Sequence, residues 1–120
     1  MHKSILIVDD NAPIRGLVKA VIEARTDLEV WEATDGPEGI EKSLELKPDL
    51  IILEFEMARI NGLEAAAALH RTIPRSSIIL FAFYKDAIPS RMARDAGIAS
   101  ILSKWDQLDV LADEVQKLTA

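Results

Sequence analysis

Short apolar runs alternate with helical patterns along the whole 120-residue chain, and this alternation limits the folds that the chain can adopt. Apolar residues also recur at helical spacing between and after the runs, with Asn11 as an expected N-cap and Pro13 in a first turn. Strands that alternate with helices predict an α/β domain over residues 1–120, with a parallel sheet covered on both faces. The predicted strands are 4–8, 28–33, 50–53, 77–82 and 98–102, and the predicted helices are 14–22, 37–47, 63–72, 87–95 and 108–118.

Three of the apolar runs end in charged residues. The first ends in Asp9 and Asp10, the third in Glu54, and the fifth is followed by Lys104. Open parallel sheets place their pockets at the carboxyl ends of the strands, so these residues predict a site. A shorter carboxylate at position 54 could accept a phosphoryl group. Glutamate reaches further by one C–C bond, about 1.5 Å, and displacement chemistry is sensitive to errors of about that size.

Composition excludes several classes of function. The chain has 20 acidic and 14 basic residues, a net charge of −6, which argues against nucleic-acid binding by this segment. It has no cysteine, which excludes disulfides and thiolate metal sites and fits a cytoplasmic location. No apolar stretch approaches the length of a signal-peptide core or a membrane span, so we expect no membrane association.

Three segments carry motifs that are specific in combination: ILIVDDNAPIR at 5–15, PDLIILEFEMARINGLEA at 48–65 and SILSKWD at 100–106. In this order and at these spacings they resemble the receiver domain of two-component response regulators, and the resemblance spans the whole chain. It implies a flavodoxin-like, doubly wound parallel sheet of five strands in the order 2-1-3-4-5, with five helices.

The resemblance also implies a site. In that family, an aspartate ending strand three takes a phosphoryl group from a histidine kinase, and an acidic pair binds Mg²⁺ with help from a backbone carbonyl. Asp9 and Asp10 match the acidic pair, and Asp10 is the better candidate for a direct metal ligand. Glu56 matches the residue whose carbonyl faces the metal, and Lys104 matches the lysine that pairs with the phosphoryl group.

The departures from the family pattern cluster around the same chemistry. Glu54 replaces the acceptor aspartate, Phe81 stands where a Ser or Thr hydroxyl is usual, and Ile101 replaces the aromatic residue that switches inward. Trp105 replaces a proline that usually follows a cis peptide bond. A cis bond before Trp would cost about 2.5–4 kcal/mol, so we expect a trans bond there.

Two interpretations of Glu54 remain open. It either mimics a phosphorylated aspartate or neutralises Lys104 and fills the pocket, and we favour neutralisation because the hydroxyl and the aromatic switch are absent. Three carboxylates near one lysine leave excess negative charge. We therefore expect either weak Mg²⁺ binding at Asp9, Asp10 and Glu54 or a raised pKa on one of these acids.

These residues predict a pseudo-receiver that signals through protein–protein contact without a conventional aspartyl phosphate, and that is not an enzyme. The alternative is a working receiver that a histidine kinase phosphorylates in the presence of Mg²⁺, on Glu54 or on Asp9 or Asp10. A third hypothesis, a small phosphate-ester enzyme using Asp10, Glu54 and Lys104, lacks a Gly-rich phosphate cradle and a nucleophile set.

Aromatic and apolar residues gather in the last third of the chain, around the fourth helix, the fifth strand and the start of the fifth helix. In receivers that face docks partners, so we expect contacts there with a histidine kinase, an output domain or a second copy as a homodimer. The alternative is that several of these residues belong to the core. The candidates are Tyr84, Ile88, Arg91, Met92 and Trp105.

Overall fold

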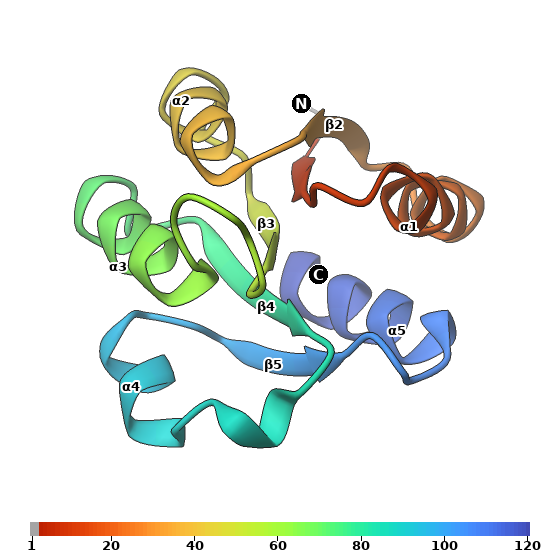
Figure 1. Ribbon diagram of the computed structural model, residues 1–120. Coiled ribbons are helices and arrows are strands. Elements are labelled where there is room, and N and C mark those ends of the chain that lie inside the picture. The colour runs from red at the N-terminus through yellow and green to blue at the C-terminus, as the bar shows by residue number, and fades with distance from the viewer. Residues whose placement is uncertain (1–2) are drawn as a thin grey trace.

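A five-stranded parallel sheet forms the centre of the protein (Figure 1), in a computed structural model that describes residues 3–120. The strand order is β2-β1-β3-β4-β5, and every neighbouring pair is parallel. This confirms the predicted doubly wound sheet of order 2-1-3-4-5. The strands are β1 (Ser4–Val8), β2 (Glu29–Ala33), β3 (Leu50–Glu54), β4 (Ser77–Ala82) and β5 (Ser100–Ser103).

Helices cover both faces of the sheet (Figure 1). Helices α1 and α5 lie side by side on one face, and α2, α3 and α4 cover the other. Within residues 3–120, no helix is long and apolar enough to cross a membrane. The helices are α1 (Ala12–Arg25), α2 (Gly36–Leu46), α3 (Gly62–Thr72), α4 (Ser90–Asp95) and α5 (Leu108–Thr119), and a short 3₁₀ helix, η1 (Lys85–Ala87), precedes α4.

Each face of the sheet has its own hydrophobic core, because side chains alternate along a strand. In β1, Ile5 and Ile7 pack under α1 and α5, whereas Leu6 and Val8 pack under the helices of the other face. Strand β3 is buried along its whole length, as expected for a strand that has neighbours on both sides and helices on both faces. Glu54, the last residue of β3, is therefore buried together with the apolar residues that precede it in the strand.

Side-chain caps start the helices that follow the first three strands. The side chain of Asn11 accepts a hydrogen bond from the Ile14 N–H at 3.0 Å, which confirms the predicted N-cap. Asp35 and Asn61 cap α2 and α3 in the same way, at 2.8 and 2.9 Å. Such caps satisfy backbone donors that have no partner inside the helix. They hold the loops at the carboxyl edge of the sheet in defined conformations.

Two of the boundaries that differ from the prediction have a clear local cause. The helix expected over 87–95 is interrupted at Pro89, which lies at the N-cap of α4 because proline lacks the N–H that a helix interior needs. The strand expected over 98–102 begins at Ser100, because the turn at Gly97, with a φ of 78°, brings the chain onto the sheet later. No cis peptide bond occurs in the described residues, so the trans bond expected before Trp105 is confirmed.

Candidate functional site

The predicted site residues meet at the carboxyl edge of the sheet. Asp9 and Asp10 follow β1, Glu54 is the last residue of β3, and Lys104 follows β5. The Lys104 backbone N–H donates to the Ala82 carbonyl at 2.8 Å, which extends the pairing of β5 with β4 to the position of the lysine. The structure therefore brings together four residues that the sequence places on three separate strands.

Lys104 lies at the centre of this cluster. Its ammonium nitrogen Nζ is 3.0 Å from Asp9 Oδ2 and contacts Glu54 Oε1. The side chain of Lys104 is 1% exposed, and Asp9 and Glu54 are 2% and 3% exposed. One cation thus neutralises part of the charge of two buried carboxylates.

The remaining carboxylate oxygens of Asp9 and Glu54 accept hydrogen bonds from the backbone. Asp9 Oδ1 accepts from the Asn11 N–H at 2.8 Å, and Glu54 Oε2 accepts from the Asp10 N–H at 3.1 Å. Each oxygen of the two buried carboxylates therefore has a protein donor. Both side chains are held in place by groups of the chain itself.

The pKa of Glu54 is raised to about 8 from its ordinary value of 4.5. Burial is the main cause, because a charged carboxylate loses solvation in the interior. The hydrogen bond from Lys104 lowers the pKa, whereas the neighbouring Asp10 and Asp9 raise it. Of the two expected ways to relieve the excess charge, the raised pKa of one acid occurs at Glu54, whereas Mg²⁺ binding stays a prediction.

The acidic cluster has the composition of a hard-cation site. Asp9, Asp10 and Glu54 each offer a carboxylate oxygen, and these oxygens lie within 4.8 Å of one another. Oxygen ligands of this kind suit Mg²⁺. Asp10 is the exposed member, so the three residues fit a divalent cation that approaches from the Asp10 side.

The side chain of Glu56 points to a different partner. Its two carboxylate oxygens lie 3.1 and 3.2 Å from the Phe83 nitrogen, whose N–H they accept. This contact ties the loop after β3 to the end of β4. The role expected for the Glu56 backbone carbonyl stays a prediction.

Apolar side chains, Phe81 and Ile101, occupy the two positions where receiver domains usually have a hydroxyl and an aromatic switch residue. Phe81 pairs in register with Glu54 across β3 and β4 and is buried in the core under α1 and α5. Ile101 is half-buried and packs against the core on the opposite face of the sheet. Neither side chain can donate a hydrogen bond to a group bound at Glu54.

The Phe83 ring, which the sequence reasoning did not single out for the site, covers Lys104 and also contacts the Trp105 ring, so that Phe83 and Trp105 form an aromatic pair. The Phe83 ring lies 4.6 Å from Lys104 Nζ, and the Trp105 ring lies 5.4 Å from the Phe83 ring at an angle of 53°. Phe81 is also near, with its ring centre 5.7 Å from Nζ. The sequence did contain one indication of this contact, since Phe83 and Trp105 follow neighbouring strands at the same edge of the sheet.

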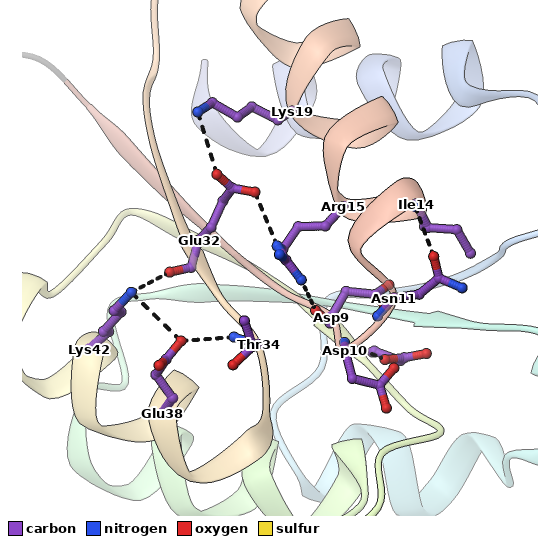
Figure 2. A network of polar contacts seen from close by, with 11 residues as sticks. Asp9, Asp10, Asn11, Ile14, Arg15, Lys19, Glu32, Thr34, Glu38 and Lys42 are labelled. Atoms are coloured by element: carbon purple, nitrogen blue, oxygen red, sulfur yellow. Dashed lines mark hydrogen bonds and ion pairs between the residues drawn. The ribbon is translucent and has the colours of Figure 1, made fainter.

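A second network, also missed, supports the Asp9 loop from outside (Figure 2). Arg15 Nη1 donates to the Asp9 carbonyl at 2.7 Å, and Arg15 Nε pairs with Glu32 Oε1 at 3.1 Å. Lys19 approaches the other oxygen of Glu32 at 3.4 Å, and Lys42 donates to the Glu32 carbonyl at 2.6 Å. Glu32 on the edge strand therefore links α1, α2 and the loop that carries Asp9.

The residues predicted to form an interface separate into two groups. Trp105 and Tyr84 are 72% and 69% exposed, and Met92 and Arg91 are also exposed. Ile88 is 5% exposed and packs in the core on the α2, α3 and α4 face, so the alternative of a core residue holds for Ile88 and its candidacy for the interface is wrong. Its position just before Pro89 directs it inward, where the interrupted helix meets the sheet.

Comparison with known proteins gives matches along nearly the whole chain. The model of the response regulator receiver domain family matches residues 5–116. The response regulator protein VraR of Staphylococcus aureus is 31% identical over 118 residues, which cover 98% of this chain and 56% of VraR. The chain thus spans little more than half the length of the curated relatives it matches.

Solved structures match over a larger share of their own length. The response regulator domain of Thermotoga maritima CheB is 27% identical, with a TM-score of 0.84, over 99% of this chain and 95% of that one. The CheY-like receiver domain protein of Methanospirillum hungatei JF-1 is 26% identical, with a TM-score of 0.89 and the same coverage.

Proposed function

This chain belongs to the response regulator receiver domain family, and we propose that it works as a pseudo-receiver, which signals through protein–protein contact without a conventional aspartyl phosphate. Receiver domains are signalling modules rather than typical enzymes. The proposal therefore concerns how this member transmits a signal when the residue at the phosphoacceptor position is Glu54.

The contact between Glu54 and Lys104 carries the proposal. Phosphoryl transfer depends on positioning and on charge stabilisation, and the lysine would have to pair with the incoming phosphoryl group. Here its ammonium group already contacts Glu54 and lies 3.0 Å from Asp9 Oδ2. Both carboxylates and the lysine are buried, so a phosphodonor would have to displace the ion pairs to reach Glu54.

Two further residues support the same conclusion. Phe81 beside Glu54 has no hydroxyl to donate to a phosphoryl oxygen, and Ile101 has no aromatic group that could switch toward such a hydroxyl. Acceptor, donor and switch have changed together. This pattern favours Glu54 as a residue that neutralises Lys104 and fills the pocket over Glu54 as a mimic of a phosphorylated state.

Weak Mg²⁺ binding forms part of the proposal. Asp9, Asp10 and Glu54 would hold the ion, which would supply positive charge that offsets the excess of carboxylates. Binding is expected to be weak because Lys104 and backbone N–H groups already satisfy the oxygens of Asp9 and Glu54. Calorimetric titration should show heat only at millimolar Mg²⁺, and no heat at that concentration would contradict this part.

The proposed partners are signalling proteins in the cytoplasm, such as a histidine kinase or an output domain, with a homodimer through α4, β5 and α5 as one form of contact. The exposed aromatic side chains of Tyr84 and Trp105 support a contact surface there, as does exposed Met92. The curated relatives are almost twice as long as this chain, so this proposal concerns the receiver domain and not the activity of the longer relatives.

The proposal is tested by incubating the protein with Mg²⁺ and acetyl phosphate and reading its intact mass. We expect no phosphoryl adduct on the native chain and an adduct on Glu54→Asp, which restores the shorter acceptor. Glu56→Asp is the matched control: it makes the same change two residues later and should gain no adduct.

An adduct on the native chain would overturn the pseudo-receiver proposal and favour the alternative of a working receiver. Peptide mapping would then show whether Glu54, Asp9 or Asp10 carries the group. The third hypothesis, an enzyme acting on phosphate esters, is tested by turnover of a generic phosphate ester with Mg²⁺, where we expect none.

A further inference from the structure

A hollow of about 460 Å³ lies beside the aromatic pair. The chain segment that follows β4 forms one wall, and the segment that follows β5 forms the other. Asp9, Asp10 and Glu54 do not line it. The hollow is therefore separate from the carboxylate cluster, although Phe83 lines the hollow and also lies beside Lys104.

Hydrogen bonds donated by backbone N–H groups hold both walls of this hollow. The Trp105 N–H donates to Ser103 Oγ at 3.1 Å, and the Asp106 N–H donates to the Ser103 carbonyl at 3.2 Å. On the other wall, the Ala87 N–H donates to the Tyr84 carbonyl at 3.0 Å. Because the walls are already ordered, a ligand would not have to order them on binding.

The hollow presents aromatic surface to solvent. Trp105 and Tyr84 line it, and both are among the most exposed large hydrophobic side chains of the described residues. One side of the Trp105 indole contacts the Phe83 ring, with the ring centres 5.4 Å apart. The faces of aromatic rings attract cations, and arginine stacks on such faces more readily than lysine.

Acidic groups flank the aromatic surface. Asp86 and Asp106 both line the hollow and are exposed, and within residues 3–120 neither forms an ion pair. Lys85 is the one cationic residue among those that line it, so the acids outnumber the bases. The two exposed rings offer faces on which a planar cation can stack, and the two free carboxylates offer hydrogen-bond acceptors for its N–H groups.

We propose that this hollow accepts an arginine side chain from another protein, with the guanidinium group against Trp105 and Tyr84 and its N–H groups directed to Asp86 and Asp106. The inference rests on the proposed function, since it gives the chemistry of the partner that a phosphorylation-independent contact would recognise. It predicts a basic rather than a purely apolar docking segment.

The test uses the ¹⁵N-labelled chain and the indole N–H signals of its two tryptophans. The probe is the peptide acetyl-Gly-Arg-Gly-amide, and its matched control replaces arginine with citrulline, which has a similar shape but no charge. We expect a saturable shift of the Trp105 signal, no shift of Trp31 on β2, and binding of the citrulline peptide weaker by about fivefold or more.

Variants separate local charge from the general acidity of the chain. Asp106→Asn should weaken binding of the arginine peptide by about fivefold, whereas Asp27→Asn, an exposed acid between α1 and β2, should leave it unchanged. Trp105→Ala should abolish saturable shifts in the backbone signals of Asp86 and Asp106.

Equal binding of the two peptides, no saturable shift, or equal effects of the two asparagine variants would overturn the proposal. The Trp105 signal could also move with protein concentration in the absence of peptide, and stop moving in the Arg91→Met, Arg94→Met double variant. That result would show that an arginine of a second copy occupies the hollow, and it would overturn the proposal of a different protein as partner. The phosphorylation test is independent: an adduct on the native chain would contradict the pseudo-receiver proposal without changing these binding results.

Discussion

The ammonium group of Lys104 contacts the carboxylate of Glu54, although the two residues are 50 positions apart in the chain and follow strands that β4 separates in the sheet. Both side chains are almost inaccessible to solvent. Groups of the protein itself therefore occupy the site. The free energy of this contact determines how the stability of the domain changes with mutation and with pH.

Removing the cation should destabilise the fold strongly. In Lys104→Met, the buried carboxylates of Glu54 and Asp9 lose their counter-ion, and breaking a buried pair from one side costs about 3–5 kcal/mol. Urea unfolding at pH 9, above the raised pKa of Glu54, measures the change. Lys85→Met is the control, since Lys85 is exposed and should change stability by no more than about 0.5 kcal/mol. Equal midpoints for the two variants would contradict the assigned role of Lys104.

The raised pKa of Glu54 makes stability depend on pH. The folded chain keeps the Glu54 proton up to about pH 8, whereas the unfolded chain releases it near 4.5. The folded state therefore binds more protons between these values, and its free energy of unfolding should fall as pH rises through this window. The slope contributed by one proton is at most about 1.4 kcal/mol per pH unit.

Glu54→Gln should remove this contribution, because glutamine does not titrate. Urea unfolding of both proteins at several pH values from 5 to 8 would show the difference in slope. Glu56→Gln is the matched control, since it leaves Glu54 in place and should keep the slope of the native chain. If Glu54→Gln also kept it, the proton would belong to another group.

Arg15 and Lys19 both pair with Glu32, but their removal should lower the stability of the domain by different amounts. Arg15 bonds both Glu32 and the Asp9 carbonyl and is mostly buried, so Arg15→Met should cost about 1–3 kcal/mol. Lys19 is more exposed and approaches Glu32 at 3.4 Å, so Lys19→Met should cost at most about 1 kcal/mol. Thermal or urea unfolding measures both, and the reverse order would show that Arg15 does not support the Asp9 loop.

Two glycine substitutions should act in opposite directions. Gly97 has a φ of 78°, and a Cβ there would lie 2.3 Å from Cγ of His70, so Gly97→Ala should destabilise by about 2 kcal/mol or more. Gly16 lies inside α1 with nothing within 4 Å of its would-be Cβ, so Gly16→Ala should stabilise by about 0.5–1 kcal/mol. Urea midpoints compare the two variants, and a stabilising Gly97→Ala would contradict the strained turn before β5.

Much of the fold and part of the site could be predicted from local pattern. The apolar runs located all five strands, and Asn11 and Pro13 located the start of α1, because burial and capping act over a few neighbouring residues. Glu54 and Lys104 were identified since parallel strands deliver their carboxyl ends to one edge of a sheet. The strand order followed from the resemblance to a family.

Other features depended on contacts between distant segments. The sequence left open whether Ile88 lies at an interface or in the core, and the structure places it in the core just before Pro89. The hydrogen bond from Arg15 to the Asp9 carbonyl and the tilted contact between Phe83 and Trp105 have no local pattern, since each joins separate elements.

Hydrophobic periodicity and the residues at strand ends thus predicted a parallel α/β sheet with charged residues at one edge, and the resemblance to receiver domains implied the strand order and the acceptor position of Glu54. Packing alone established that Glu54, Asp9 and Lys104 contact one another in a buried cluster beside the Phe83 ring. The physical reason is that periodicity records which side of an element is buried, whereas the strength and pKa of a charge depend on the distance and desolvation of groups that only the folded chain brings together.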